Sequence, residues 1–434
     1  MGAGTAQGGA CLLISGKVRK NMEFVVFAGV LLLLFIFMIV QELIQTKNQE
    51  KLFKKYLREN YGKEPPKEYS LERFARLGSY LERHKEEKQL DDITWNDLGM
   101  DEVFRRIDRT YSAAGEEYLY YTLRNISCGR EALEHLEEVV NWLQEQENIK
   151  VRIQLLMKRL GHLGKYSLYD YLDNLDYLGE RSNRKIVLGN LLYLPFLLLL
   201  FVQPAMGTIG IVLCMLWHIM TYFREKKVIE PYIISFAYVL RLIDVCEELE
   251  KQKIPVYRRE LDELREALKS LRELRRGAYW VMAGNQGKIG GNPLDILADY
   301  LRMILHLDIF QFNRMLEKLR KKTGQVENML AITGYLDMAI SVGGFRKSLE
   351  GYCIPKLEED TEKAFLHMKK GWHPLLSQPV KNSIRADRGI LLTGSNASGK
   401  STFLKMVAVN AVLAQTIHTC AAESYHAPIF QIFS

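Results

Sequence analysis

The residues of this chain with the clearest chemistry lie close together near its C-terminal end. Residues 393–402 have the sequence TGSNASGKST, in which Gly394 is followed after four residues by Gly399, Lys400 and Ser401. Glycines at this spacing let backbone N–H groups curl around phosphate oxygens, and a helix that starts at the loop adds partial positive charge. The pattern predicts a phosphate-binding loop in which Lys400 contacts the β- and γ-phosphates of a nucleotide and Ser401 binds Mg²⁺.

The segments on either side of the loop support this prediction. The apolar run 390–392 before the loop is typical of a buried strand, and residues 403–413 after it have a helical pattern. A strand, a loop and a helix in this order are the context that the motif requires. The alternative is a chance glycine-rich turn, which would not explain why all three parts agree.

The acidic half of a nucleotide-hydrolysing site is not evident. Such sites use a second strand that ends in an acidic residue, which holds Mg²⁺ and positions water. Glu423 is the only acidic residue after Lys400, and no apolar strand leads into it. We therefore expect that these 434 residues alone do not hydrolyse ATP and that they are a fragment or truncated form of a longer protein.

Composition sets broad limits on the class of protein. A length of 434 residues suggests two or three domains, and 48% hydrophobic residues suffice for a sizeable core. The formal charge of +7 is compatible with nucleic acid or with an anionic membrane surface, and does not choose between them. None of the six cysteines forms a C-x-x-C pair, so neither a zinc site nor a disulfide framework is indicated.

Three apolar segments are candidates for membrane spans: residues 24–40, 186–202 and 205–223. The last two are joined by Gln203-Pro204 and flanked by basic residues at both ends, which predicts a helical hairpin with both ends in the cytoplasm. A pair of buried core helices is the alternative. For residues 24–40 an uncleaved anchor competes with a cleaved signal peptide, and no small-x-small cleavage site follows. If the nucleotide loop is cytosolic and the hairpin returns to the same side, the single span at residues 24–40 places the N-terminus outside the cell. Translation that starts at Met22 would leave very few residues to cross the membrane.

Helical patterns occupy most of the remaining chain. Residues 133–143 carry apolar side chains at helical spacing. Residues 256–276 form a strongly amphipathic, charged helix, which indicates either a long arm or coiled-coil pair, or an ordinary surface helix of a bundle.

Several segments, taken in order, resemble proteins of the MutS family. The loop is similar to the family's T-G-x-N-x-x-G-K-S-T, with Asn396 as its asparagine. The other matching segments are DITWNDL (92–98), DRT (108–110) with Gly115, LDMAIS (336–341), YCIP (352–355), GWHP (371–374) and CAA (420–422). Trp372 replaces the family's usual arginine, and CAA falls where the family usually has V-P-A.

This resemblance implies a fold that is mainly α with a C-terminal α/β portion. It comprises a helical MutS-type core with lever arms and the start of an ABC-type P-loop ATPase domain, to which transmembrane helices are added. It also implies ATP and Mg²⁺ as cofactors, a homodimer through the ATPase domain in the full-length protein, and DNA between paired arms. Carried over by position, the nucleotide-binding residues are Gly394, Ser395, Asn396, Ala397, Ser398, Gly399, Lys400, Ser401, Thr402 and Asn382, with Ser401 on Mg²⁺.

The expected organisation has seven parts. They are a disordered tail (1–21), a transmembrane anchor (22–44), a charged helical stalk (45–90), the first part of the core (91–185), the membrane hairpin (186–223), the core and lever helices (224–370) and an incomplete ATPase domain (371–434).

The departures from the family pattern decide the functional hypotheses. Nothing before the core resembles the family's mismatch-reading domain, whose aromatic-x-Glu wedge stacks on a mispaired base, so mismatch specificity is doubtful. The first hypothesis is a multi-pass protein of the cell membrane with a cytoplasmic ATPase domain, whose ATP-driven clamp movement acts on DNA. The second is a membrane assembly or transport-accessory protein that uses a MutS-type ATPase without DNA. The third is an inactive truncated product.

Overall fold

The computed structural model describes residues 37–38, 40–41, 44–64, 69, 71–86, 88–126, 129–163, 167–275, 293–359, 364–395 and 399–434. They belong to two compact units, residues 1–60 and 61–434. In the first unit residues 44–60 are helical. The expected tail and nearly all of the anchor expected at residues 24–40 lie outside the described residues.

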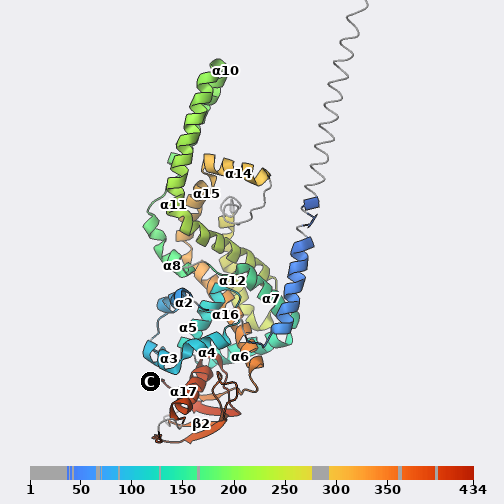
Figure 1. Ribbon diagram of the computed structural model, residues 1–434, viewed down its shortest axis with the longest axis vertical. Coiled ribbons are helices and arrows are strands. Elements are labelled where there is room, and N and C mark those ends of the chain that lie inside the picture. Colours follow the sequence, from blue (N-terminus) through green and yellow to red (C-terminus); the bar gives the residue numbers. More distant parts are fainter. Residues whose placement is uncertain are drawn as a thin grey trace, which may run out of the picture. The chain divides into compact units, whose positions relative to one another are not determined.

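The second unit is mainly helical and has a small mixed sheet near its C-terminal end, as the sequence predicted (Figure 1). Short 3₁₀ turns add to the α-helices of this unit. The α-helices are α2 (Leu71–Arg83), α3 (Asp92–Leu98), α4 (Met100–Ile107), α5 (Ala113–Arg124), α6 (Arg130–Glu145), α7 (Glu147–Leu160), α8 (Leu168–Asp173), α9 (Arg184–Leu191), α10 (Tyr193–Val202), α11 (Pro204–Glu250), α12 (Arg258–Leu271), α14 (Pro293–Leu305), α15 (Leu307–Arg320), α16 (Thr323–Ser348) and α17 (Lys400–Ile417).

The helical core is built around the packing of α5 on α16. The two helices approach closely because a glycine lies at the contact: a Cβ at Gly334 would lie 2.6 Å from the main-chain oxygen of Ala114. α2 covers another side of α5, so the second half of the segment expected as a stalk packs on the core. The apolar stripe predicted on α6 is buried, as its spacing indicated.

The charged helix predicted at residues 256–276 is part of this bundle. α12 and the 3₁₀ turn Arg272–Arg275 bury the stripe formed by Leu261, Leu264, Leu268, Leu271 and Leu274. α12 packs on α11 and α16. The structure therefore has a bundle helix here, in place of a free arm.

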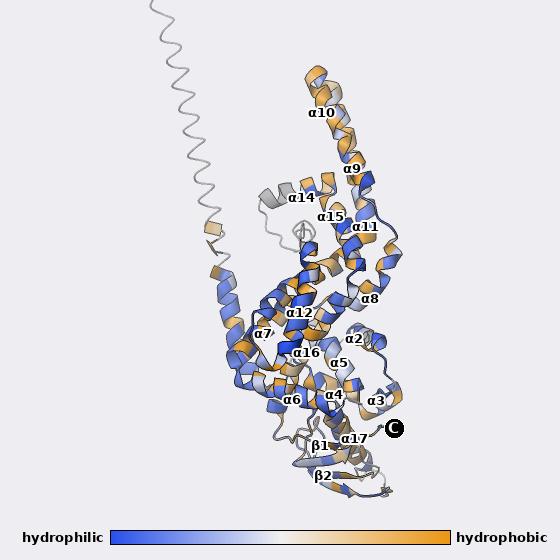
Figure 2. Cartoon of the chain, turned by 180° about the vertical axis from the view of Figure 1, so that it is seen from behind, coloured by the Kyte–Doolittle hydropathy of each residue, from blue (hydrophilic) through white to orange (hydrophobic). Residues whose placement is uncertain are grey.

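The expected membrane hairpin is formed by α9, α10 and the first part of α11. Two described segments are long and apolar enough to cross a membrane, Arg184–Val202 with 19 residues and Pro204–Glu230 with 27. They extend away from the core, and Figure 2 shows hydrophobic residues over most of their length. α11 continues without interruption from this hairpin to Glu250 inside the core, over 47 residues or about 70 Å.

The sheet has the strand order β1-β4-β2-β3, with β1 (Lys356–Glu358), β2 (Leu366–Gly371), β3 (Asn382–Ala386) and β4 (Ser424–Pro428). β1 and β4 are parallel, whereas β2 is antiparallel to both of its neighbours. α17 packs on β2 and on α5.

The prediction of a buried strand at residues 390–392 is wrong. The run is not assigned to a strand and pairs with none of the four described ones, and Leu391 is 88% exposed. Without a neighbouring strand its backbone has no ladder to join, and its side chains have no sheet layer in which to be buried.

Candidate functional site

The predicted phosphate loop lies directly before the first residue of α17. Gly399 is the N-cap of this helix and has a left-handed φ of 84°, which a residue with a side chain would adopt only with strain. The Lys400 ammonium donates hydrogen bonds back to the main-chain oxygens of Gly394 and Ser395, the latter at 2.8 Å. The two ends of the motif are therefore brought together, with the lysine charge held over the loop.

The remaining residues predicted for nucleotide binding have different outcomes. Ser401 and Thr402 lie exposed in the first turn of α17. Residues 396–398 lie outside the described part of the chain. Asn382 lies exposed at the start of β3, where its side-chain amide donates to the Val380 oxygen at 3.0 Å, and no described hydrogen bond joins it to the loop.

The arrangement fits a phosphate better than it fits a complete magnesium site. Lys400 and the N-terminus of α17 both favour an anion at the loop. Among the described residues no group of three or more His, Cys, Asp or Glu side chains could hold a metal ion. The Ser401 hydroxyl is the group predicted for Mg²⁺, and it would need further ligands from the nucleotide and water.

Glu423, the acidic residue singled out in the sequence, is engaged elsewhere. It precedes β4, and its carboxylate accepts from Lys369 at 2.8 Å and lies 3.1 Å from the Lys370 ammonium. Hydrogen bonds from these two lysines lower the pKa of Glu423. The negative charge of the Glu423 carboxylate is therefore balanced by the two lysine ammonium groups.

The far end of α17 is held by a buried arginine that the sequence analysis did not single out. Arg346, near the end of α16, is 1% exposed and donates to the main-chain oxygen of His418 at 2.9 Å and to the Thr419 hydroxyl at 2.8 Å. A cation at the C-terminus of a helix is stabilised by the helix dipole. Arg346 also forms an ion pair of 2.7 Å with Glu137 of α6. One side chain thus joins α16, α6 and the helix that carries the loop.

Glu137 completes this junction. Burial alone would raise the pKa of its carboxyl, but hydrogen bonds from His418 and Arg346 lower that pKa to about 2. The Glu137 carboxyl is therefore charged throughout the neutral range. The sequence shows that a basic residue, Arg346, follows the apolar run of α16. It does not show which residues this side chain contacts.

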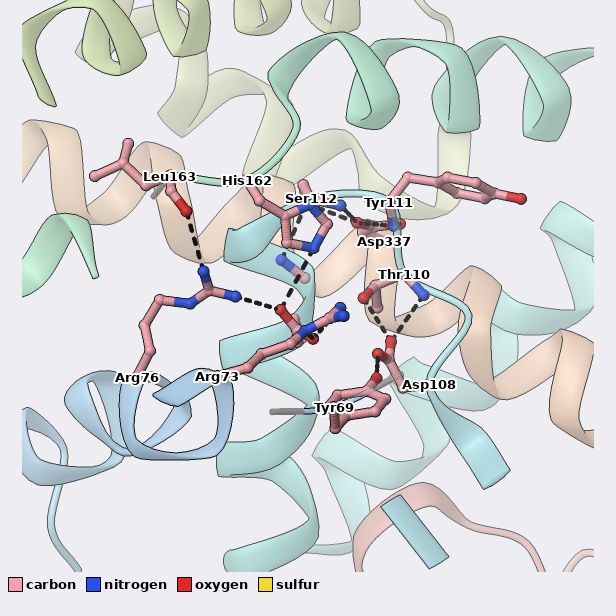
Figure 3. Close-up of polar contacts among 12 residues, drawn as sticks. Tyr69, Arg73, Arg76, Asp108, Thr110, Tyr111, Ser112, His162, Leu163 and Asp337 are labelled. Carbon is pink, nitrogen blue, oxygen red and sulfur yellow. Dashed lines mark hydrogen bonds and ion pairs between the residues drawn. The ribbon is translucent and has the colours of Figure 1, made fainter. Parts of the chain in front are cut away.

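Two segments that carried the family resemblance meet in the core. Asp337 of the LDMAIS segment is 1% exposed and accepts from the backbone N–H of Ser112 at 2.8 Å, from the Ser112 hydroxyl at 2.6 Å and from the backbone N–H of Tyr111 (Figure 3). Ser341, one turn later, donates to the Ile107 oxygen and accepts from the Arg109 N–H, both at 2.8 Å. α16 therefore fixes the connection between α4 and α5, which contains the DRT segment.

Neighbouring polar groups extend this arrangement (Figure 3). Glu116 of α5 is fully buried and accepts from Arg73 at 2.6 Å and from Arg76 at 2.9 Å, both on α2. Asp108 accepts from the backbone N–H of Thr110 at 2.9 Å. These groups bind one another and the main chain, so their role is to hold the core helices in register.

Comparison with known proteins supports a MutS-like family for part of the chain. The "DNA mismatch repair protein MutS" of Acholeplasma laidlawii is 32% identical over 124 residues, which are 27% of this chain and 14% of that protein. The protein of the same name from Listeria monocytogenes is 32% identical over 129 residues, with the same shares. "MutS protein homolog 4" of Homo sapiens is 28% identical over 123 residues, or 26% of this chain and 12% of that protein.

No family model matches the chain. The chain covers between 12% and 14% of the length of these three relatives. The similarity agrees with the motifs, and the activity of the whole relatives does not follow from it.

Proposed function

We propose that this chain is a membrane-anchored, MutS-like ATP-binding protein, in which nucleotide binding at the loop before α17 moves the helical core and its levers. The observation that carries the proposal is the Lys400 ammonium held by loop carbonyls at the start of α17. A lysine in this position forms charge-assisted hydrogen bonds with nucleotide phosphates.

The junction at Arg346 supports a mechanical link from the loop to the core. α17 begins at the nucleotide loop and ends against Arg346, which belongs to α16. Because the side chain is buried and bonded on several sides, a shift of α17 along its axis would strain these contacts unless α16 moved as well. α16 packs on α5, α12 and α11, so its movement would reach the long helix and the hairpin.

The exposed apolar surface of the hairpin supports a membrane location. Phe201 is 88% exposed and Leu198 is 70% exposed. Contiguous apolar surface of this extent is unfavourable in water and favourable in a bilayer. The basic residues that flank the hairpin lie at its base, which is the pattern expected for the cytoplasmic side. The cell membrane with a cytoplasmic loop at Lys400 is the location that we propose.

A role on DNA is the part of the family function with the least structural support. Along the charged helix α12, Arg259 lies 3.4 Å from Glu263 and Arg265 lies 2.8 Å from Glu250. Lys269 lies 2.6 Å from Glu266. A helix face with alternating charges favours solvent over a polyanion. This observation favours the second hypothesis, a membrane assembly or accessory protein that uses the ATP-binding unit without DNA.

The Lys400→Ala variant of the full chain tests the proposal. We expect its affinity for a fluorescent ATP analogue to fall at least tenfold, because the charge-assisted contact to phosphate is lost. Lys405→Ala is the matched control, since Lys405 lies exposed on the same helix outside the loop, and it should bind within twofold of the wild type. Equal binding by Lys400→Ala and the wild type would refute the nucleotide site.

A further inference from the structure

The base of the hairpin contains a cavity that shares no lining residue with the loop before α17. Its volume is about 540 Å³, within the range of about 300–1,000 Å³ typical of small-molecule sites. Its walls come from α9, α11, α15 and the segment before α9. Three bases and two acids line it: Arg181, Lys185, Arg224, Glu180 and Glu225.

The charges at the rim favour an anion. Arg181 and Glu225 are paired with each other, so their charges cancel. Lys185 and Arg224 are exposed, and no carboxylate among the described residues lies within ion-pair distance of either. With Glu180 included, the three bases and two acids of the lining have a net formal charge of +1. Two unpaired cations at one rim are a suitable contact for a phosphate group.

The interior presents hydrogen-bond acceptors. His306 lies between α14 and α15, is 5% exposed and adopts a left-handed φ of 53°. Its Nε2 lies 3.3 Å from the Thr221 hydroxyl. Because that hydroxyl donates its own hydrogen to main-chain oxygens of α11, we assign the ring hydrogen to Nε2, which then donates to Thr221. Burial and the neighbouring His218 lower the pKa of His306 to about 4, so the ring is neutral. In this tautomer its Nδ1 carries no hydrogen and is an acceptor.

Both inner acceptors lack a partner among the described residues. The His306 Nδ1 and the Asn313 side-chain oxygen are buried and accept no hydrogen bond there. The Asn313 amide is fixed in orientation because it donates to the Asn183 side chain at 2.9 Å. Buried acceptors without a donor are costly, and a ligand hydroxyl would satisfy them.

We infer that this cavity binds a hydroxyl-bearing phosphate ester, with the phosphate on Lys185 and Arg224 and the hydroxyl groups directed to His306 and Asn313. The position at the base of an apolar hairpin, where lipid headgroups would lie, favours a phosphoglycerol lipid headgroup over a soluble phosphate ester. This inference rests on the membrane insertion proposed above, and it adds a ligand at a site distinct from the nucleotide loop.

Binding to the purified full chain in a non-ionic detergent tests the inference. The probes are dioctanoyl phosphatidylglycerol, dioctanoyl phosphatidylcholine and glycerol 3-phosphate, each titrated by isothermal calorimetry. We expect phosphatidylglycerol to bind at least tenfold more tightly than the other two. Equal binding of phosphatidylcholine would refute the assigned headgroup chemistry. Equal or tighter binding of glycerol 3-phosphate would refute the lipid source.

Variants locate the site. Lys185→Gln combined with Arg224→Gln should weaken phosphatidylglycerol binding at least tenfold, whereas Arg258→Gln combined with Arg259→Gln removes the same charge from α12 outside the cavity and should change it less than twofold. The His306→Asn variant should also weaken phosphatidylglycerol binding. Asparagine is chosen because it tolerates the left-handed φ at this position. Unchanged binding in the first double variant would refute the site. Carbonate-resistant membrane association, measured on the membrane fraction from which each variant is purified, separates this failure from failure of the proposed anchoring.

Discussion

The two halves of α11 both carry large apolar side chains, but these side chains lie in opposite surroundings. In the half that belongs to the hairpin, Leu213 is 61% exposed and Met220 is 69% exposed. In the half that enters the core, Leu242 and Leu249 are completely buried. Apolar composition alone therefore does not define a membrane helix, because the partner helices decide whether the same side chains are buried in protein or stay exposed.

The two halves of α11 also differ in the charged groups that surround them. The core half of α11 packs beside helices whose charged groups are bonded to partners, as Asp337 is. Along residues 186–223 the sequence has no acidic or basic residue other than His218 between its flanks. A buried charge is tolerated where fixed dipoles replace water, and a lipid-facing surface offers none.

The largest effect is expected from Asp337→Ala. The substitution leaves the N–H groups of Tyr111 and Ser112 buried without their acceptor, which should lower the free energy of unfolding by about 3–5 kcal/mol. Urea denaturation of the detergent-solubilised chain measures this. Asp262→Ala, on the exposed face of α12, is the control and should change it by less than about 0.5 kcal/mol. A loss below about 1 kcal/mol for Asp337→Ala would show that the contact of Asp337 with the connection between α4 and α5 is not structural.

A pair of alanine substitutions in α11 tests the comparison itself. Leu242→Ala should cost about 2–4 kcal/mol, because it opens a cavity in the core. Leu213→Ala should cost less than about 0.5 kcal/mol in the same assay, since its side chain contacts little protein. Equal losses would mean that the hairpin half is packed against protein in solution, and that the membrane interpretation fails.

A smaller, pH-dependent effect is expected at Glu137. The pKa of its carboxyl is lowered to about 2 in the folded chain, so the stabilisation is present above the ordinary value of 4.5 and is lost as the pH falls towards 2. With allowance for partial solvent screening, the advantage of the wild type over Glu137→Gln should be about 2 kcal/mol near pH 6 and should disappear near pH 2. A difference independent of pH would show that the ion pair with Arg346 does not form.

The sequence predicted some of these features better than others. The glycine and lysine spacing predicted a loop that leads into a helix, because that chemistry is local, and α17 does begin at Lys400. Its role in nucleotide binding stays a prediction. The continuity of α11 was not predicted, because the expected organisation placed a boundary at the basic flank 224–227. In the structure the helix runs through this flank into the core, where it packs on neighbouring helices.

Long-range contacts account for what the sequence did not reveal. Arg346 meets Thr419 across 73 residues, and Asp337 meets Ser112 across 225. No periodicity within a helix encodes such a meeting, although the resemblance had marked several of the segments involved. The wrong strand at residues 390–392 has the same origin, since a strand depends on a neighbour elsewhere in the chain.

Cysteine labelling tests most directly the claim that α11 joins a membrane hairpin to a cytoplasmic core. Gln203→Cys, at the tip of the hairpin, and Lys269→Cys, on the core helix α12, are expressed separately in a bacterial host and exposed in spheroplasts to a membrane-impermeant maleimide. The wild type, with its native cysteines, gives the baseline. We expect Gln203→Cys to be labelled in intact spheroplasts and Lys269→Cys only after permeabilisation. Labelling of both variants only after permeabilisation would contradict a hairpin that crosses the membrane.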